Sequence, residues 1–424
     1  MNTLIICPFF KKNHINFGRS LEAEIAEFEN LGQALPQITI KEIISIELKL
    51  IKAGKLFGSG KIREISDINS KFHIGLVLVD FTLSPIQQRN LEKSWHVKVL
   101  DRNGLILEIF AMRANTREGV LQVELASLDY QKTRLVRSWT HLERQRGGIG
   151  FMGGPGETQI ESDRRALSDK IVRIKSSLQR VIKTRSLHRS NRQRKSIPTV
   201  ALIGYTNTGK SSLFNVLTNS DVLVKDMLFA TLDPTARSVE LLGTGGKSII
   251  MSDTVGFISN LPTQLIAAFK ATLEEVINAD LIIHVQDVSN EHSKVQEIEV
   301  LKTLKELDWR DRKQPKIINV FNKIDRLSSE ELALLKLRCS NSTNKVLVSA
   351  KSGAGIEYLR NQIKLNLMPK QSTEVIFIRY NDTKKRSWLF NEKIVISEHS
   401  DDVGFHVKVR WSKNKKNQFV SRFF

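Results

Sequence analysis

The sequence has little cysteine, because only Cys7 and Cys339 occur among its 424 residues. That argues against a disulfide framework or a cysteine metal site and fits a reducing compartment. Long apolar runs are lacking too, and none approaches the roughly 20 residues of a membrane span. A secretory signal carries its charge before a longer apolar core, whereas Leu4–Phe10 is short and precedes Lys11 and Lys12. We interpret Leu4–Phe10 as a strand and expect a cytoplasmic protein, with partial membrane association as the alternative.

The charge balance is strongly basic. Lysine and arginine total 65 against 45 acidic residues, for a formal net charge of +20. Hydrophobic residues make up 41% and charged residues 26%, which is typical of globular proteins and not of disorder. The surplus favours a polyanionic partner such as nucleic acid. A lysine-rich genome composition explains it equally well, and both interpretations stay open.

The pattern along the chain predicts four segments. They are an α/β subdomain (1–115), a helical hairpin with a glycine-rich tip and a basic linker (116–197), a nucleotide-binding domain (198–370) and a small α+β domain (371–424). The first segment mixes strand-like runs, Ile74–Val79 and Leu105–Phe110, with a helical pattern at Ser20–Leu31. Its basic glycine-bearing stretch Gly54–Lys61 is interpreted as a loop between a helix and the next element.

Two apolar series at spacings of 3, 4 or 7 predict a helical hairpin. The first is Leu121, Leu125, Leu128, Leu135, Trp139 and Leu142, and the second is Ile160, Leu167, Ile171, Ile174, Leu178 and Val181. Gly147–Gly156 between them is too glycine-rich to stay helical. We expect two antiparallel arms, each roughly 35–40 Å long. Gly148, Gly150 and Gly153 match a dinucleotide-binding spacing, but a long helix and not a strand precedes them, so we interpret the tip as a flexible finger.

A basic tract follows the second predicted helix and ends at Pro198. Its members are Arg180, Lys183, Arg185, Arg189, Arg192, Arg194 and Lys195. The tract is a solvated linker at least, and a contact to a phosphate backbone is the other interpretation. Its candidates for RNA contact are Arg185, Arg189, Arg192 and Arg194. Gly150, Gly153 and Gly154 of the tip are further candidates, because a side-chain-poor finger can approach another surface closely.

The region after Thr199 alternates apolar runs with helical patterns. The predicted strands are Val200–Ile203, Ser248–Met251, Leu281–Val285, Ile317–Val320 and Val346–Val348. Continuous apolar runs separated by helix-length segments indicate a parallel sheet covered on both faces. Strand signals at Glu374–Arg379, Lys393–Ile396 and Gly404–Val409 predict the last small domain.

The strongest motif is a complete GxxxxGKS phosphate loop between a predicted strand and a predicted helix. It consists of Gly204, Tyr205, Thr206, Asn207, Thr208, Gly209, Lys210 and Ser211. The glycines let backbone amides curl around phosphates, and the following helix N-terminus adds positive potential. Lys210 would place its charge at the β- and γ-phosphates, and the Ser211 hydroxyl would bind Mg²⁺.

A second motif, Asp253, Thr254, Val255 and Gly256, directly follows a predicted strand. Asp253 would hold Mg²⁺ through water, and the amide of Gly256 would contact the γ-phosphate, which makes this segment a switch.

A third motif, Asn322, Lys323, Ile324 and Asp325, selects the base. A carboxylate accepts two hydrogen bonds from guanine N1 and N2, a pair of donors that adenine does not offer. Binding adenine would leave the Asp325 carboxylate without these bonds, at a cost of about 1–3 kcal/mol or more. Ser349, Ala350 and Lys351 complete the base pocket through backbone contacts.

The first switch lies between these motifs, at Phe229, Ala230, Thr231, Leu232 and Asp233, followed by Pro234 and Thr235. A hydroxyl is needed there as a second direct Mg²⁺ ligand, and we choose Thr231 over Thr235. The predicted catalytic residues are therefore Lys210, Thr231 and Gly256. Four motifs in this order predict a GTP hydrolase.

Two residues bear on the rate. Phe257 stands where many small GTPases place a glutamine that orients the attacking water, so we expect slow hydrolysis without a partner. Asn207 offers a carbonyl oxygen beside the phosphates, where it would help to bind K⁺. A loop-capping role for Asn207 is the other interpretation.

With these residues in hand, the sequence resembles the HflX family of translational GTPases over nearly all its length. The resemblance rests on four long segments and on the pair Ser84-Pro85: Gly147–Arg165 (GGIGFMGGPGETQIESDRR), Gln88–Glu92, Ile109–Ala126 and Phe229–Thr235. Many members read GIG-x-R-GPGE at the tip. Here Phe151, Met152 and Gly153 stand where those members have the arginine. The resemblance therefore implies no direct arginine contact from the tip.

The resemblance implies an N-terminal α/β subdomain, a helical hairpin, a G domain of the translation-factor class and a small C-terminal domain. It also implies GTP and GDP binding, contact with the large ribosomal subunit and its rRNA near the peptidyl-transferase region, and GTP-dependent splitting of stalled or inactive ribosomes. We expect a monomer. Two alternatives are a GTPase assembly factor for precursor subunits and an RNA-binding regulator gated by GTP.

Overall fold

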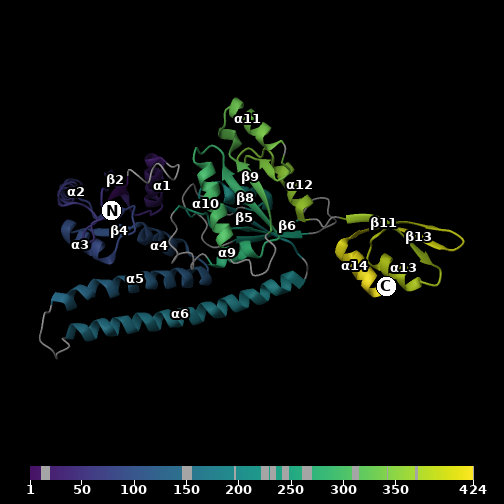
Figure 1. The fold of residues 1–424 in the computed structure, drawn as a ribbon, viewed down its shortest axis with the longest axis horizontal. Coiled ribbons are helices and arrows are strands. Elements are labelled where there is room, and N and C mark those ends of the chain that lie inside the picture. Colours follow the sequence, from purple (N-terminus) through teal and green to yellow (C-terminus); the bar gives the residue numbers. More distant parts are fainter. Residues whose placement is uncertain are drawn as a thin grey trace. The chain divides into compact units, whose positions relative to one another are not determined.

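The computed structural model describes residues 1–10, 20–145, 155–194, 197–220, 229, 235–240, 248–259, 270–307, 315–340, 342–367 and 371–423. Two compact units divide the chain, Met1–Arg360 and Asn361–Phe424 (Figure 1). Among the described residues, the sheets contain four, six and three strands. No helix in these ranges is both long and apolar enough to span a membrane.

The first sheet is parallel, with the strand order β2-β1-β3-β4. Its strands are β1 (Asn2–Phe9), β2 (Thr39–Glu47), β3 (Leu76–Val79) and β4 (Lys98–Asp101), and the helices are α1 (Leu21–Gln33), α2 (Ser59–Phe72), α3 (Pro85–Trp95) and α4 (Arg102–Arg113). Both faces of β1 are apolar: Ile5 packs with α1 and α4, while Ile6 packs in a separate cluster with α2 and α3. Two buried faces explain why these strands read as continuous apolar runs.

The expectation of a strand at Leu105–Phe110 is wrong, because these residues lie inside α4. A short apolar run fits a strand and a buried helix equally well. The Asp101 side chain decides the matter by accepting a hydrogen bond from the Gly104 amide (2.8 Å) as the N-cap. The glycine-bearing loop also differs from expectation, since it follows strand β2 and not a helix, and α2 already begins at Ser59.

A hairpin of two long helices follows, α5 (Arg117–Gln145) and α6 (Pro155–Arg194). Leu128, Ile171 and Ile174 are buried between them, as the apolar spacing predicts. Helices of 29 and 40 residues span about 43 and 60 Å, longer than the arms expected. For α6 the reason is that the basic tract expected as a linker continues the helix as far as Arg194.

The six-stranded sheet has the order β10-β9-β8-β5-β7-β6. Its strands are β5 (Thr199–Gly204), β6 (Thr235–Glu240), β7 (Ser248–Asp253), β8 (Leu281–Asp287), β9 (Lys316–Asn322) and β10 (Lys345–Leu347). All pair in parallel except the edge strand β6, which the sequence pattern did not predict. The helices are α7 (Lys210–Thr218), α9 (Lys270–Ile277), α10 (Ser293–Glu306), α11 (Ser329–Cys339) and α12 (Ile356–Leu367). This is a P-loop GTPase fold with a mostly parallel sheet, as predicted.

The second unit contains a three-stranded antiparallel sheet in the order β11-β13-β12. Its elements are β11 (Gln371–Arg379), α13 (Thr383–Asn391), β12 (Val395–Ser400), β13 (Gly404–Ser412) and α14 (Lys413–Phe423). Helices α13 and α14 lie on the same face of the sheet (Figure 1). Leu389 of α13 and Phe419 of α14 pack there against Val407 and Val409. The small C-terminal α+β domain is therefore confirmed.

Candidate nucleotide-binding site

The phosphate-loop motif forms the turn between β5 and α7, at the carboxyl edge of the sheet where ligands of α/β folds bind. Gly209 has φ +86°, and a Cβ atom there would lie 2.3 Å from Nδ2 of Asn322. Only glycine fits this position. The same amide nitrogen donates to the carbonyl oxygen of Thr208 (2.8 Å), so the third motif supports the loop directly.

Lys210 begins α7 and lies buried inside the loop. Its Nζ donates to the carbonyl oxygen of Tyr205 at 2.6 Å. Burial lowers the pKa of Lys210 to about 8, although the nearby charge of Asp253 opposes the shift. The buried ammonium is thus short of negative charge, and a triphosphate in the loop would supply it.

Ser211 and Asp253 fit a magnesium site. The Ser211 hydroxyl donates to Oδ2 of Asp253 at 2.6 Å, and Asp253 is fully buried at the end of β7. Hard oxygen donors beside a phosphate loop are what Mg²⁺ prefers, with waters and nucleotide oxygens completing the shell. Within the described ranges no group of three or more His, Cys, Asp or Glu side chains forms a metal site. These two residues would therefore share the ion with the nucleotide.

The base-specificity motif follows β9. The Asn322 Oδ1 accepts from the amide of Ala350 (3.0 Å), which ties the Ser349–Lys351 segment to the motif. Lys323 donates to the carbonyl oxygen of Asn207 (2.7 Å) and pairs with Asp287 (2.7 Å). The structure thus brings together the first and third motifs and the Ser349–Lys351 segment at one edge of the sheet.

Asp325 presents a carboxylate that is open to a base. It lies in the short helix η1 (Ile324–Arg326) and is exposed. The hydroxyl of the buried Ser349 donates to its Oδ1 at 2.6 Å, and this bond lowers the pKa of Asp325. The carboxylate is therefore ionised at neutral pH and able to accept hydrogen bonds from guanine.

The second motif lies directly against the phosphate loop. Phe257 exchanges backbone hydrogen bonds with the loop, donating to Gly204 O (3.0 Å) and accepting from Thr206 N (2.8 Å). A Cβ atom at Gly256 would lie 2.8 Å from both Lys210 Nζ and Thr206 Cα. Gly256 therefore occupies a place beside Lys210 that no larger residue could take.

Ser259, three residues further on, is held by the N-terminal sheet. Arg102, at the start of α4, donates to the Ser259 carbonyl oxygen (3.1 Å) and hydroxyl (3.0 Å). The same guanidinium pairs with Glu27 and with Asp80, both at 2.7 Å. The Tyr205 hydroxyl of the phosphate loop donates to Glu27 (3.0 Å) and accepts from the Ser259 amide. We call these five residues the switch clamp.

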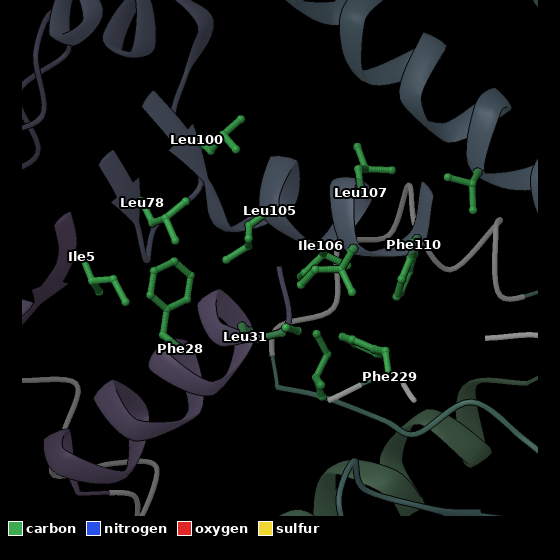
Figure 2. Close-up of a cluster of buried hydrophobic side chains, with 14 of the residues drawn as sticks. Ile5, Phe28, Leu31, Leu78, Leu100, Leu105, Ile106, Leu107, Phe110 and Phe229 are labelled. Atoms are coloured by element: carbon green, nitrogen blue, oxygen red, sulfur yellow. The ribbon is translucent and has the colours of Figure 1, made fainter. Parts of the chain in front are cut away.

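Apolar side chains of both switches extend the contact. Phe229 is buried, and its ring meets the Phe110 ring edge-on at 4.8 Å between centroids (Figure 2). Val255 and Ile258 belong to the same core cluster, which also includes Ile106 of α4. The N-terminal core thus includes residues from both predicted switch segments.

Sequence reasoning missed the switch clamp. The sequence did contain a signal, because Asp80 and Arg102 are charged residues that each directly follow a buried strand. Both therefore lie at the carboxyl edge of a parallel sheet. Ligands of such sheets bind at that edge. Here the edge holds a segment of the same chain.

Some predicted site residues lie outside the described residues. They are Ala230, Thr231, Leu232 and Asp233 of the first switch and Gly150, Gly153 and Gly154 of the tip. Arg185, Arg189, Arg192 and Arg194 lie in α6, but their side chains are also outside the described set. Thr231 as a Mg²⁺ ligand and these RNA contacts stay predictions.

His284, buried in β8 beneath the site, predicts a pH dependence. Burial lowers its pKa to about 4, although the hydrogen bond to Asn319 acts in the opposite direction and raises the pKa. Between pH 6.5 and 4 the unfolded state therefore binds a proton that the folded state does not. Stability is complete above pH 6.5 and should fall by about 1.4 kcal/mol per pH unit toward pH 4, roughly 3 kcal/mol in all.

The measurement is amide hydrogen exchange of β8 and β9 between pH 7 and pH 4.5, after correction for intrinsic exchange. His284→Gln keeps a neutral polar side chain and should flatten the dependence. Equal slopes in the two proteins would assign the pH effect to other groups.

The chain is similar to known proteins over most of its length. Family models described as "GTP-binding GTPase N-terminal", "GTP-binding GTPase Middle Region" and "50S ribosome-binding GTPase" match residues 22–111, 113–192 and 199–323. The chain is 42% identical over 393 residues to a protein named GTPase HflX from Escherichia coli (strain K12), covering 92% of this chain and 90% of that protein.

A second relative, GTPase HflX from Magnetococcus marinus, is 52% identical over 308 residues, or 73% of this chain and 69% of that protein. A solved structure of a GTP-binding protein from the archaeon Sulfolobus solfataricus, in complex with GDP, matches 87% of this chain and 99% of that chain. Its sequence identity is 22% and its TM-score 0.46.

Proposed function

This chain belongs to the HflX family of GTPases, and we propose that it binds the large ribosomal subunit and uses GTP to split or rescue stalled or inactive ribosomes. Membership makes the chain a GTP hydrolase. The matching family description, "50S ribosome-binding GTPase", supports the proposed partner, and so does the net charge of +20, which suits rRNA.

The observation that carries the proposal is the contact of both switch segments with the N-terminal sheet. A γ-phosphate needs the Gly256 amide, which lies beside Lys210. Ser259, three residues away, is held by Arg102. We propose that a shift of Gly256 toward a phosphate pulls Ser259 and so changes how the N-terminal sheet is held. GTP binding and hydrolysis would thereby change the contact that this sheet and the hairpin make with the ribosome.

The proposed metal ligands are Ser211 and Thr231 directly and Asp253 through water. Bound Mg²⁺ would neutralise charge on the β- and γ-phosphates. Lys210 and the loop amides would hold the phosphates, and Asp325 would select guanine. Phe257 offers no group to orient water, so we expect slow turnover alone and faster turnover with the large subunit.

The role of K⁺ is a narrower proposal. The backbone oxygen of Asn207 is already engaged by Lys323, which leaves its side-chain oxygen as the candidate ligand. Phosphate release should be faster in potassium than in sodium, with and without large subunits. Equal rates would leave Asn207 as a loop cap.

Sucrose-gradient sedimentation tests the proposed function. Intact ribosomes with the wild-type protein and GTP should separate into subunits, whereas Lys210→Met should leave them intact. Lys336→Met removes the same charge from the exposed face of α11 and should act like wild type. Migration only with precursor particles would favour the assembly factor. RNA binding without any ribosome association would favour the GTP-gated regulator.

A further inference from the structure

Among the described residues, the three-stranded sheet of the second unit has one face that neither α13 nor α14 covers. Helices α13 and α14 both pack on the other face (Figure 1). Side chains on a strand alternate between faces. Along β11, Ile378 is fully buried toward the helices, whereas Val375 and Phe377 are 62% and 44% exposed. We call the second face the open face. Its residues are Val375, Phe377 and Arg379 of β11 and His406, Lys408 and Arg410 of β13.

Charge is segregated between the two faces. The register pairs Val375 with Lys408 and Phe377 with His406, and Arg410 follows on the same side of β13. Lys408, Arg410 and Arg379 are all exposed. The acidic residues within these strands lie on the helix side, and each has a cation there, whereas Asp401, just after β12, pairs with His406 of the open face at 2.7 Å. Glu374 pairs with Lys416 of α14 at 2.7 Å, and Glu398 pairs with Arg386 of α13 at 2.8 Å.

Two rings and three cationic side chains share the open face. The Phe377 ring of the edge strand β11 lies 5.1 Å from the His406 ring of β13, centroid to centroid. Lys408 and Arg410 are two residues apart on β13, about 6.8 Å along the strand. A purely apolar partner would not need these cations, and a ring beside a strip of cations is what single-stranded nucleic acid needs for base stacking and phosphate contact.

We propose that the open face binds single-stranded RNA. Unpaired bases would stack on Phe377 and His406, while Lys408, Arg410 and Arg379 contact the phosphates. Stacking needs bases that are free of pairing, so a duplex should bind more weakly. The inference goes beyond the proposed function, because it assigns a partner to the second unit that requires neither GTP nor a whole ribosome.

The experiment uses the full chain and a fluorescein-labelled 12-nucleotide oligouridylate, with binding followed by fluorescence anisotropy. The double variant Lys408→Ala/Arg410→Ala should bind about tenfold more weakly at low salt. The slope of log K against log salt should become shallower by about 1.4, because two phosphate contacts are lost. Phe377→Ala should also bind about tenfold more weakly but with an unchanged salt slope, since a stack and not a charge is removed.

The matched control is Lys384→Ala/Arg422→Ala. It removes the same charge from exposed positions on α13 and α14 of the same unit. Its affinity should stay within about twofold of wild type at 0.15 M salt, because charges facing away from the RNA are screened. A circular dichroism spectrum for each variant confirms that the sheet is retained.

Several results would overturn the inference: no binding by wild type, equal losses in face and control variants, or a hairpin duplex that binds as tightly. A polyglutamate competitor that displaces the RNA, and whose own binding needs Lys408 and Arg410, would point to an acidic protein. Failure here leaves the proposed function standing if the same face variants still split ribosomes. Loss of splitting in the Lys210→Met control alone has no bearing on the open face.

Discussion

The Arg102→Met variant is expected to destabilise the N-terminal sheet by about 3–5 kcal/mol, because it removes the cation that pairs with two largely buried carboxylates, Glu27 and Asp80. Arg102 itself is only 8% exposed in its side chain, and Glu27 and Asp80 are 13% and 14% exposed. The charges of Asp80 and Glu27 raise the pKa of Arg102 despite its burial, so the guanidinium stays charged. Methionine keeps much of the volume and removes only the charge and the donors.

Amide hydrogen exchange of β1 and β3 measures this effect, because their slowest amides report the opening of the whole sheet. Lys98→Met is the control. Lys98 pairs with Glu108 at 3.7 Å on the surface, and both side chains are about half exposed, so its loss should cost less than about 1 kcal/mol. If Arg102→Met cost no more than Lys98→Met, the switch clamp would not stabilise the fold.

A rescue experiment separates the charge from the contact with Ser259. Adding Glu27→Gln and Asp80→Asn to Arg102→Met removes the two carboxylates that lost the Arg102 charge and should restore much of the lost stability. The segment around Ser259 should remain less protected from exchange, because its carbonyl and hydroxyl contacts to Arg102 are still missing. Protection equal to wild type there would show that Arg102 does not hold the switch.

The Lys210→Met variant is expected to lower the turnover of GTP by about 100-fold or more, which is the usual effect of removing one preorganised charge from a transition state. In the proposed role, Lys210 Nζ meets developing charge between the β- and γ-phosphates. Phosphate release under saturating GTP and large subunits measures the change. Lys336→Met should retain the wild-type rate.

The stability of nucleotide-free Lys210→Met distinguishes a functional loss from unfolding. Burial lowers the pKa of Lys210 to about 8, so the fold disfavours its charge before phosphate arrives. The variant should therefore be at least as stable as wild type without nucleotide, and less stabilised by added GTP. Turnover within about twofold of wild type would mean that Lys210 has no part in transition-state stabilisation.

The G domain could largely be predicted from the sequence, because its motifs combine particular residue types at fixed spacings with a strand before and a helix after. The glycines and Lys210 of the phosphate loop lie where that pattern predicts. The helical hairpin was readable too, since spacings of 3, 4 and 7 do not fit a strand. Its arms were predicted too short, because nothing in a lysine- and arginine-rich helix marks where it becomes a linker.

Local signals failed where two structures satisfied the same pattern. Leu105–Phe110 is apolar throughout, and only the cap from Asp101 and the packing of Ile109 and Phe110 make it a helix. Strand β6 is an edge strand with largely exposed residues, so it lacks the apolar run by which the other strands were found.

The sequence by itself predicted the phosphate loop and the carboxylate for guanine, since each depends on residue types at short, fixed separations. It predicted Ser211 and Asp253 as magnesium-binding residues from their places in the phosphate loop and at a strand end. Only the tertiary structure decided what the switches touch and which face of the last sheet is open. Arg102 and Ser259 are 157 residues apart, and Glu27 and Ser259 are 232 apart. Contacts over such separations leave no periodic trace in the sequence, because they depend on how sheets pack and not on local geometry.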